Sequence, residues 1–217
     1  MQIRLGSLVV FVCLSACASA PSRQGAPARN ASSLSAQACL ADALPVAPAP
    51  QSFVWRDHEC GFGGPACVGA CEAGDADACL AHAYAIEAAG HDALRTRRWY
   101  ERACRLGSLN GCTNWGAGFG TTDATPGELV CATRVFERTC AGREPWGCGM
   151  WGMALVYGRG IAADAQRGLA VLDRACRELG HFPCVVLATA IEERDPEAAS
   201  ALYERACATG YADACEP

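Results

Sequence analysis

The chain has 217 residues and a formal charge of −5, with sixteen cysteines and no lysine among its 18 basic residues. The acidic balance argues against nucleic-acid binding, which needs a basic field to neutralise phosphates. The absence of lysine excludes a Walker-type phosphate loop, a Ser-x-x-Lys hydrolase site and a Schiff-base nucleophile. Apolar residues make up 51% of the chain, so the composition predicts a globular protein with a packed core.

The N-terminus has the pattern of an export signal. Its apolar stretch, residues 5–14, is too short for a membrane-spanning helix, which needs about 20 residues. Leu-Ser-Ala-Cys at 14–17 resembles the lipobox of bacterial lipoproteins, which implies that residues 1–16 are a signal peptide and that Cys17 carries the lipid. The alternative is an ordinary signal-peptidase cut after Ala18 or Ala20.

A segment rich in alanine, serine and proline, residues 17–52, follows the signal. Its prolines interrupt any periodic pattern, so this segment is predicted to be a tether. Within it, Ser35–Leu44 is compatible with a short helix that docks on the folded body. By the lipoprotein resemblance, alanine rather than aspartate after the cysteine implies the outer membrane of the bacterial cell envelope, facing the periplasm or exported. Membrane contact is expected through the lipid at Cys17 only.

An internal repeat dominates the rest of the chain. Its first cysteines recur at intervals of 31 to 36 residues, within the range of helical-hairpin repeats. Four of these cysteines end the same five-residue pattern: an aromatic residue or leucine, an acid, an arginine, a small residue and the cysteine. The apolar members of the pattern have the spacing of a buried helix face, while the acid and the arginine are expected to face water. Ten cysteines form five pairs spaced eight positions apart: Cys71 and Cys79, Cys104 and Cys112, Cys140 and Cys148, Cys176 and Cys184, Cys207 and Cys215.

The spacing of these pairs requires a turn between their members. Within one continuous helix, residues eight apart are separated by about 12 Å along the axis, whereas a disulfide needs Cα atoms within about 4.4 to 6.8 Å. Each pair is therefore predicted to connect the end of one helix to the start of the next. Glycines that would end the first helix in a left-handed conformation follow each first cysteine: Gly74, Gly107, Gly142, Gly180 and Gly210.

The second helix of each hairpin has its own pattern. A small residue lies four positions after the second cysteine and allows close helix approach: Ala83, Gly116, Gly152 and Ala188. Apolar residues follow three positions later: Ile86, Phe119, Leu155 and Ile191. Trp115 and Trp151 occupy matching positions and are expected in the core, the alternative being a cofactor-stacking role. Aspartates are placed to cap or turn into the next helix: Asp92, Asp123, Asp164 and Asp195.

The repeat resembles a known family. The Sel1-like repeat, a relative of the tetratricopeptide repeat, is matched by Gly152, Ala154, Leu155, Tyr157, Gly158, Gly160, Ile161, Asp164, Gly168, Ala170, Ala175 and Gly180. The cysteine staple looks like that of the Helicobacter cysteine-rich proteins, and the resemblance covers about residues 60–217. It implies an all-α fold, a right-handed α/α solenoid of about four hairpin repeats over residues 53–217, stapled by disulfides.

Two functions are compatible with this resemblance. The favoured one is a monomeric, lipid-anchored interaction scaffold for an envelope protein or peptide, or a peptidoglycan component. The alternative is a β-lactam-binding or β-lactamase-like hydrolase, an activity described for family members. No Ser-x-x-Lys or His-x-His-x-Asp motif supports it, because the histidines are scattered: His58, His82, His91 and His181. No catalytic residue, cofactor or nucleic-acid partner is predicted.

Four cysteines remain once Cys13 leaves with the signal and Cys17 carries the lipid. Cys60 and Cys67 flank a glycine-rich turn and are predicted to pair, which leaves Cys39 with Cys131 as the remainder. A zinc site built from His58, Cys60, Cys67 and Cys71 is the less favoured alternative, because disulfides predominate in an oxidising envelope. No Cys-x-x-Cys motif indicates redox catalysis.

Overall fold

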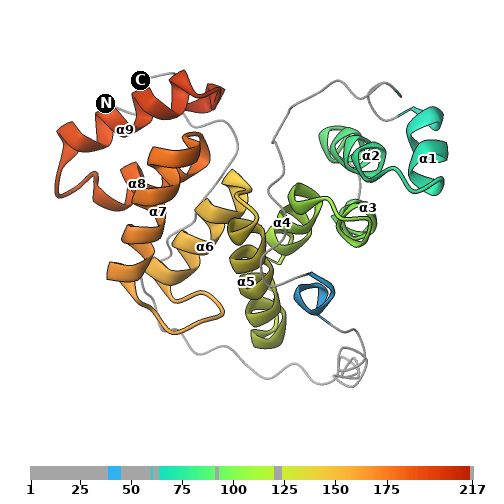
Figure 1. The fold of residues 1–217 in the computed structure, drawn as a ribbon, viewed down its shortest axis with the longest axis horizontal. Helices are drawn as coiled ribbons and strands as arrows, with labels where there is room; N and C mark the ends of the chain where they lie inside the picture. The colour runs from blue at the N-terminus through green and yellow to red at the C-terminus, as the bar shows by residue number, and fades with distance from the viewer. Residues whose placement is uncertain (1–38, 45–59, 61–63, 91–92, 120–123, 216–217) are drawn as a thin grey trace, which may run out of the picture. The chain divides into compact units, whose positions relative to one another are not determined.

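The computed structural model describes residues 39–44, 60, 64–90, 93–119 and 124–215. Every regular element in these ranges is helical, in agreement with the predicted all-α class (Figure 1). None of the helices found there combines the length and apolarity that a membrane span requires. The elements are η1 (Leu40–Ala43), α1 (Pro65–Glu72), α2 (Ala76–Ala88), α3 (Ala93–Arg105), α4 (Leu109–Ala117), α5 (Pro126–Ala141), α6 (Pro145–Tyr157), α7 (Ala165–Leu179), α8 (Phe182–Ile191), α9 (Pro196–Ala208) and η2 (Ala212–Ala214).

The helices form two layers. Each helix packs against the next along the chain, which gives the predicted sequence of hairpins (Figure 1). In addition α2 contacts α4, α4 contacts α6, and α6 contacts α8. We therefore call α2, α4, α6 and α8 the even layer, and α3, α5, α7 and α9 the odd layer. An odd helix ends one to three residues after the first cysteine of a pair, and from α3 to α7 the even helix after it contains the second.

In four of the five pairs, the turn between the two cysteines is made by a left-handed residue three positions after the first cysteine, whereas after Cys176 the left-handed residues are Gly180 and His181. Gly74, Gly107 and Gly210 occupy this position with φ near +100°, a conformation that costs glycine little. The prediction for Gly142 is wrong, because its φ is −79° and Arg143, with φ 62°, takes the left-handed position instead. The repeat position, rather than the glycine itself, determines where the helix ends.

Polar caps start several helices. Asp164 and Asp195 accept hydrogen bonds from the backbone N–H groups of Arg167 and Ala198, both at 3.0 Å, as the sequence predicted. Thr125 and Glu128 form a capping box at the start of α5. The other two predicted aspartates, at positions 92 and 123, lie outside the described residues.

The core lies between the layers. In three repeats the first residue of the predicted stripe of the odd helix is buried, as with Tyr100, Phe136 and Leu172, whereas the matching Tyr203 of α9 is half-buried. From the even layer, Trp151 and Leu155 pack beside Phe136 in one apolar cluster. Trp151 is 5% exposed and therefore belongs to the core, as expected, and Trp115 packs partly buried against the same cluster.

The short segment Cys39–Leu44 is part of the folded unit. Leu40 and Ala41 are buried against the Cys104–Cys112 disulfide and Val135. Asp42 forms an ion pair with Arg134 of α5. The compact unit therefore starts at Cys39, whereas composition placed the start of the solenoid at residue 53. The docked η1 lies within Ser35–Leu44, the segment expected to be compatible with a short helix on the folded body.

Candidate functional site

Fourteen cysteines lie within the described residues, and they are joined in seven disulfides. The five pairs spaced eight apart have Cα–Cα distances of 4.3 to 4.8 Å, and Cys60–Cys67 and Cys39–Cys131 have 4.9 and 5.6 Å. Each of the first four repeat pairs connects an odd-numbered helix to the even helix after it, and Cys207–Cys215 connects α9 to the end of η2. The predicted lipid site Cys17 lies outside the described residues.

The even layer from α4 onward carries no charged side chain. The sequences of α4, α6 and α8 contain no Asp, Glu, Lys, Arg or His, whereas α2 contributes Asp77 and Glu87. A small opening lies between α4, α5 and α6, and its lining is mostly apolar, including Phe119, Phe136, Met150 and Met153, with Arg159 as its one charged residue. The two methionine side chains are half-buried, so this uncharged layer presents apolar surface to solvent.

Next to the apolar surface, the even layer carries an amide network that crosses from one repeat to the next. The hydroxyl of Tyr84 on α2 donates to Oδ1 of Asn110. The side-chain amide of Asn114 donates to the Tyr84 hydroxyl (3.1 Å) and to the backbone carbonyl of Asn110 (2.9 Å). Burial raises the pKa of Tyr84 far above its usual range, which keeps this phenol a neutral donor.

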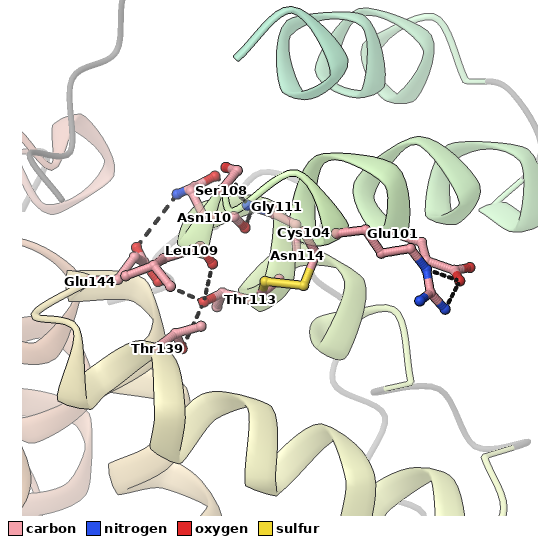
Figure 2. Close-up of a disulfide and its surroundings, with 12 residues drawn as sticks. Glu101, Cys104, Ser108, Leu109, Asn110, Gly111, Thr113, Asn114, Thr139 and Glu144 are labelled. Atoms are coloured by element: carbon pink, nitrogen blue, oxygen red, sulfur yellow. Dashed lines mark hydrogen bonds and ion pairs between the residues drawn. A yellow bond between two sulfur atoms is a disulfide. The ribbon is translucent and has the colours of Figure 1, made fainter. Parts of the chain in front are cut away.

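Glu144 continues the network into the core. It is 2% exposed and caps α6 by accepting from the backbone N–H groups of Trp146 (3.0 Å) and Gly147 (2.6 Å). The Thr113 hydroxyl of α4 donates to it across 2.6 Å and also lies 3.0 Å from the Thr139 hydroxyl of α5, so the carboxyl group that caps α6 is linked to two other helices (Figure 2). Burial raises the Glu144 pKa, opposed in part by these hydrogen bonds.

Sequence reasoning missed Glu144, although a signal for it was present. Glu144 occupies the position four residues after the first cysteine, where Asp75 and Ser108 cap α2 and α4. A proline follows it at the first position of α6, which is a typical start of a helix. What the sequence did not show is its burial, which depends on Thr113 and Thr139 from two other helices.

Aromatic side chains line one edge of the last repeats. The rings of Trp146 and Phe182 stack with centroids 4.2 Å apart. Phe182 also lies 5.8 Å from the ring of Tyr211, which in turn contacts His181 edge-on at 5.1 Å. These residues start α6, α8 and η2, so the row ties three consecutive repeats together.

The arginine of the repeat template does more than face solvent. Although Arg102 and Arg205 are exposed, the Arg102 guanidinium donates to the carbonyl of Cys71 (3.4 Å), and Arg205 donates to the carbonyls of Cys176 (3.1 Å) and Arg177 (2.7 Å). Each arginine thereby binds carbonyls at or near the C-terminus of the odd-numbered helix one repeat earlier. Cations at this end of a helix are favourable. The predicted solvated face is therefore also a contact between repeats.

The two described histidines have packing and backbone roles. His82 is buried and contacts the Trp99 ring edge-on at 4.4 Å. His181 precedes α8, its backbone N–H donates to the Thr209 hydroxyl (2.6 Å), and burial lowers its pKa. Within the described residues, no group of three or more His, Cys, Asp or Glu side chains has the geometry of a metal site.

Known proteins resemble this chain in fold rather than in sequence. No protein-family model and no curated protein matches the sequence. A Sel1 repeat protein from Oxalobacter formigenes superposes with a TM-score of 0.55 at 16% identity, over 65% of this chain and 60% of that one. A protective antigen present in uropathogenic Escherichia coli strains, with an SLR fold, gives 0.56 at 20% identity, over 70% of this chain and 34% of that one.

Helicobacter pylori cysteine-rich protein B also matches, with a TM-score of 0.40 at 22% identity over 51% of this chain and 81% of that one. The chain spans 60% of the length of the Oxalobacter protein and about a third of the Escherichia coli antigen. The two matches above a TM-score of 0.5 agree with the helical hairpins and layers described above. This chain therefore has the fold of the Sel1-repeat solenoids.

Proposed function

We propose that this chain is an exported, lipid-anchored scaffold of the bacterial envelope that binds a segment of a partner protein on its even layer. The observation that carries the proposal is the absence of charge from α4, α6 and α8. A solenoid of repeats offers an extended surface of this kind to a ligand. Where this layer reaches solvent, as at the half-buried Met150 and Met153, it favours a partner that is itself largely apolar, because a charged group would lose its hydration there.

The side chains on this surface suit a peptide. Met150 and Met153 line the apolar opening, and methionine adapts to ligands of varied shape. Asn114 belongs to the same layer, on α4, and is held by Tyr84 and Asn110. Its amide N–H groups are used within this network, and its side-chain carbonyl oxygen is of the type that accepts from the backbone N–H of an extended segment.

A matched pair of substitutions tests this surface. Met153→Asp places a charge in the even layer, and Val130→Asp places one on α5, where Val130 is 47% exposed. After cross-linking in intact cells, we expect the partner of the full chain to be lost with Met153→Asp and kept with Val130→Asp. Retention with both variants, each shown to be folded by circular dichroism, would refute the proposed surface.

The anchor has a separate test. Cys17→Ser removes the proposed acylation site, so the protein is expected to leave the membrane fraction and to lose the mass of the lipid. Unchanged fractionation and mass would show that the lipobox interpretation is wrong. The seven disulfides support an oxidising location such as the envelope.

A further inference from the structure

Both methionines of the folded unit lie on the same face of α6. The chain has three methionines, and Met1 starts the predicted signal peptide. Met150 and Met153 are three residues apart on α6, which places their side chains on one face of the helix. They line the same opening between α4, α5 and α6, and both side chains are half-buried. Two thioether groups are therefore concentrated at one place on the even layer.

Within the described residues, these two thioethers are the only sulfur groups that are not already oxidised. The cysteines found there are all joined in disulfides. A methionine sulfur that is not sealed in the core takes up one oxygen atom to give the sulfoxide. A mild oxidant such as a peroxide should therefore act on Met150 and Met153 before any other sulfur of the folded unit.

A sulfoxide would change the chemistry of the opening. Met150 packs against the apolar cluster around Phe136, and Met153 packs against the cluster between α7 and α8. An oxygen atom on either sulfur needs a hydrogen-bond donor, because a buried acceptor without one is costly. The Thr133 hydroxyl in the lining already donates to the carbonyl of Arg159 (2.7 Å). The sulfoxide would therefore be paired by water or by the Arg159 guanidinium, and in either case the opening would become polar.

From this arrangement we propose that Met150 and Met153 form an oxidation site that controls the binding of the partner on the even layer. A peroxide delivers one oxygen atom to each sulfur: the O–O bond breaks, an S–O bond forms, the sulfur is oxidised and the peroxide is reduced to water or an alcohol. The inference rests on the proposed function, because the surface that becomes polar is the one assigned to the partner. Methionine sulfoxide reductases, supplied with electrons by a thiol, reverse the change.

Peroxide treatment of intact cells that contain the full chain tests the proposal. Hydrogen peroxide is added, the partner is cross-linked to the chain, and the chain is then digested and mapped by mass spectrometry. We expect positions 150 and 153 to gain one oxygen atom each. The cross-linked fraction of the chain should fall in proportion as the sulfoxide fraction rises.

Two variants separate this effect from other damage by peroxide. Met150→Leu with Met153→Leu keeps apolar side chains of similar volume but has no sulfur to oxidise, so it should keep the partner with and without peroxide. Met150→Gln with Met153→Gln makes the opening polar and should lose the partner without any peroxide. The proposal is wrong if the two methionines gain no oxygen, if the oxidised chain keeps its partner, or if the leucine variant loses its partner on treatment.

The result with Met153→Asp distinguishes this inference from the proposed function. If Met153→Asp loses the partner while the oxidised chain keeps it, the surface is correct and the oxidation site is refuted. If Met153→Asp keeps the partner, the proposed surface is refuted, and control of binding by oxidation is refuted with it.

Discussion

The two helical layers differ in charge far more than in length. In the even layer α4, α6 and α8 are uncharged, whereas each odd helix from α3 to α9 carries at least three charged residues. Ion pairs lie within α3 and α7 and between α5 and α7, as with Glu137 and Arg167. The odd layer supplies most of the contact with water, so the even layer is free to carry packing and recognition.

Small residues of the even layer let the layers approach closely. A Cβ atom added at Gly152 would lie 2.4 Å from Cγ of Leu172, and one added at Gly116 would lie 2.8 Å from the Phe136 ring. Both partners belong to the odd layer. The aromatic and leucine positions of one layer therefore fit against the glycines of the other.

Cutting the disulfide between the layers should have the largest effect. Cys140→Ala together with Cys148→Ala frees α5 from α6 in the middle of the array and should cost about 2 to 4 kcal/mol. The matching change at Cys207 and Cys215 should cost about 1 to 2 kcal/mol, because it frees only the residues after α9, which fray easily. Urea unfolding of both variants measures the ranking.

The two loops closed by these disulfides have equal length, with a sequence separation of 8 in each case. Each disulfide therefore restricts the unfolded chain to a similar extent. A difference in stability loss between the two variants thus reports on the native contacts alone. Equal losses would mean that the array unfolds as one cooperative block. A larger loss at the terminal pair would contradict the nearest-neighbour description of repeat proteins.

Removing Glu144 should have the next largest effect. Glu144→Ala deletes the cap of α6 and leaves the buried N–H of Gly147 without its acceptor, while Thr113 keeps the Leu109 carbonyl, which should cost about 2 to 3 kcal/mol. Asp75→Ala removes the equivalent cap of α2 at an exposed position and should cost about 1 kcal/mol. Similar losses, measured by urea unfolding, would show that the buried network adds nothing to capping.

Glycine-to-alanine substitutions test how closely the two layers pack. Gly152→Ala forces Leu172 or its helix to move and should destabilise the fold by about 1 to 3 kcal/mol. At Gly127 of α5 nothing lies within 4 Å of an added Cβ, so Gly127→Ala should stabilise by up to about 1 kcal/mol. Thermal melts give the two signs, and a neutral Gly152→Ala would show that the layers can separate without cost.

Much of this fold followed from local patterns. The cysteine spacing indicated a turn, and the stripe of Tyr100, Phe136 and Leu172 indicated which face is buried, because both depend on residues close in the chain. The closure of Cys39 with Cys131 came only by elimination, since it spans 92 residues. The docking of η1 was suggested only as a possibility of the Ser35–Leu44 segment. Its burial depends on α3 and α5, which no local pattern specifies.

The candidate surface was less accessible to sequence reasoning. The absence of charge from α4, α6 and α8 is visible in the sequence, but its meaning depends on knowing that these helices share a layer. Arg102 and Arg205 were expected only to face water. Their bonds to carbonyls one repeat earlier arise from the stacking of repeats, which a single repeat does not contain.

A pH dependence that originates in Glu144 is expected over a limited window. Burial raises its pKa in the folded state, so between the ordinary carboxyl pKa and the raised one the folded chain holds a proton that the unfolded chain has lost. Stability must therefore fall as the pH rises through that window, by about 1.4 kcal/mol per pH unit.

Glu144→Gln should abolish this fall while keeping a polar side chain of the same size. Urea unfolding from pH 4 upward, taken as the difference between the two proteins, cancels the opposite contribution of His181, whose lowered pKa weakens the fold on the acid side. Identical slopes in the two proteins would mean that the even layer holds Glu144 ionised, with its hydrogen bonds outweighing the cost of burial.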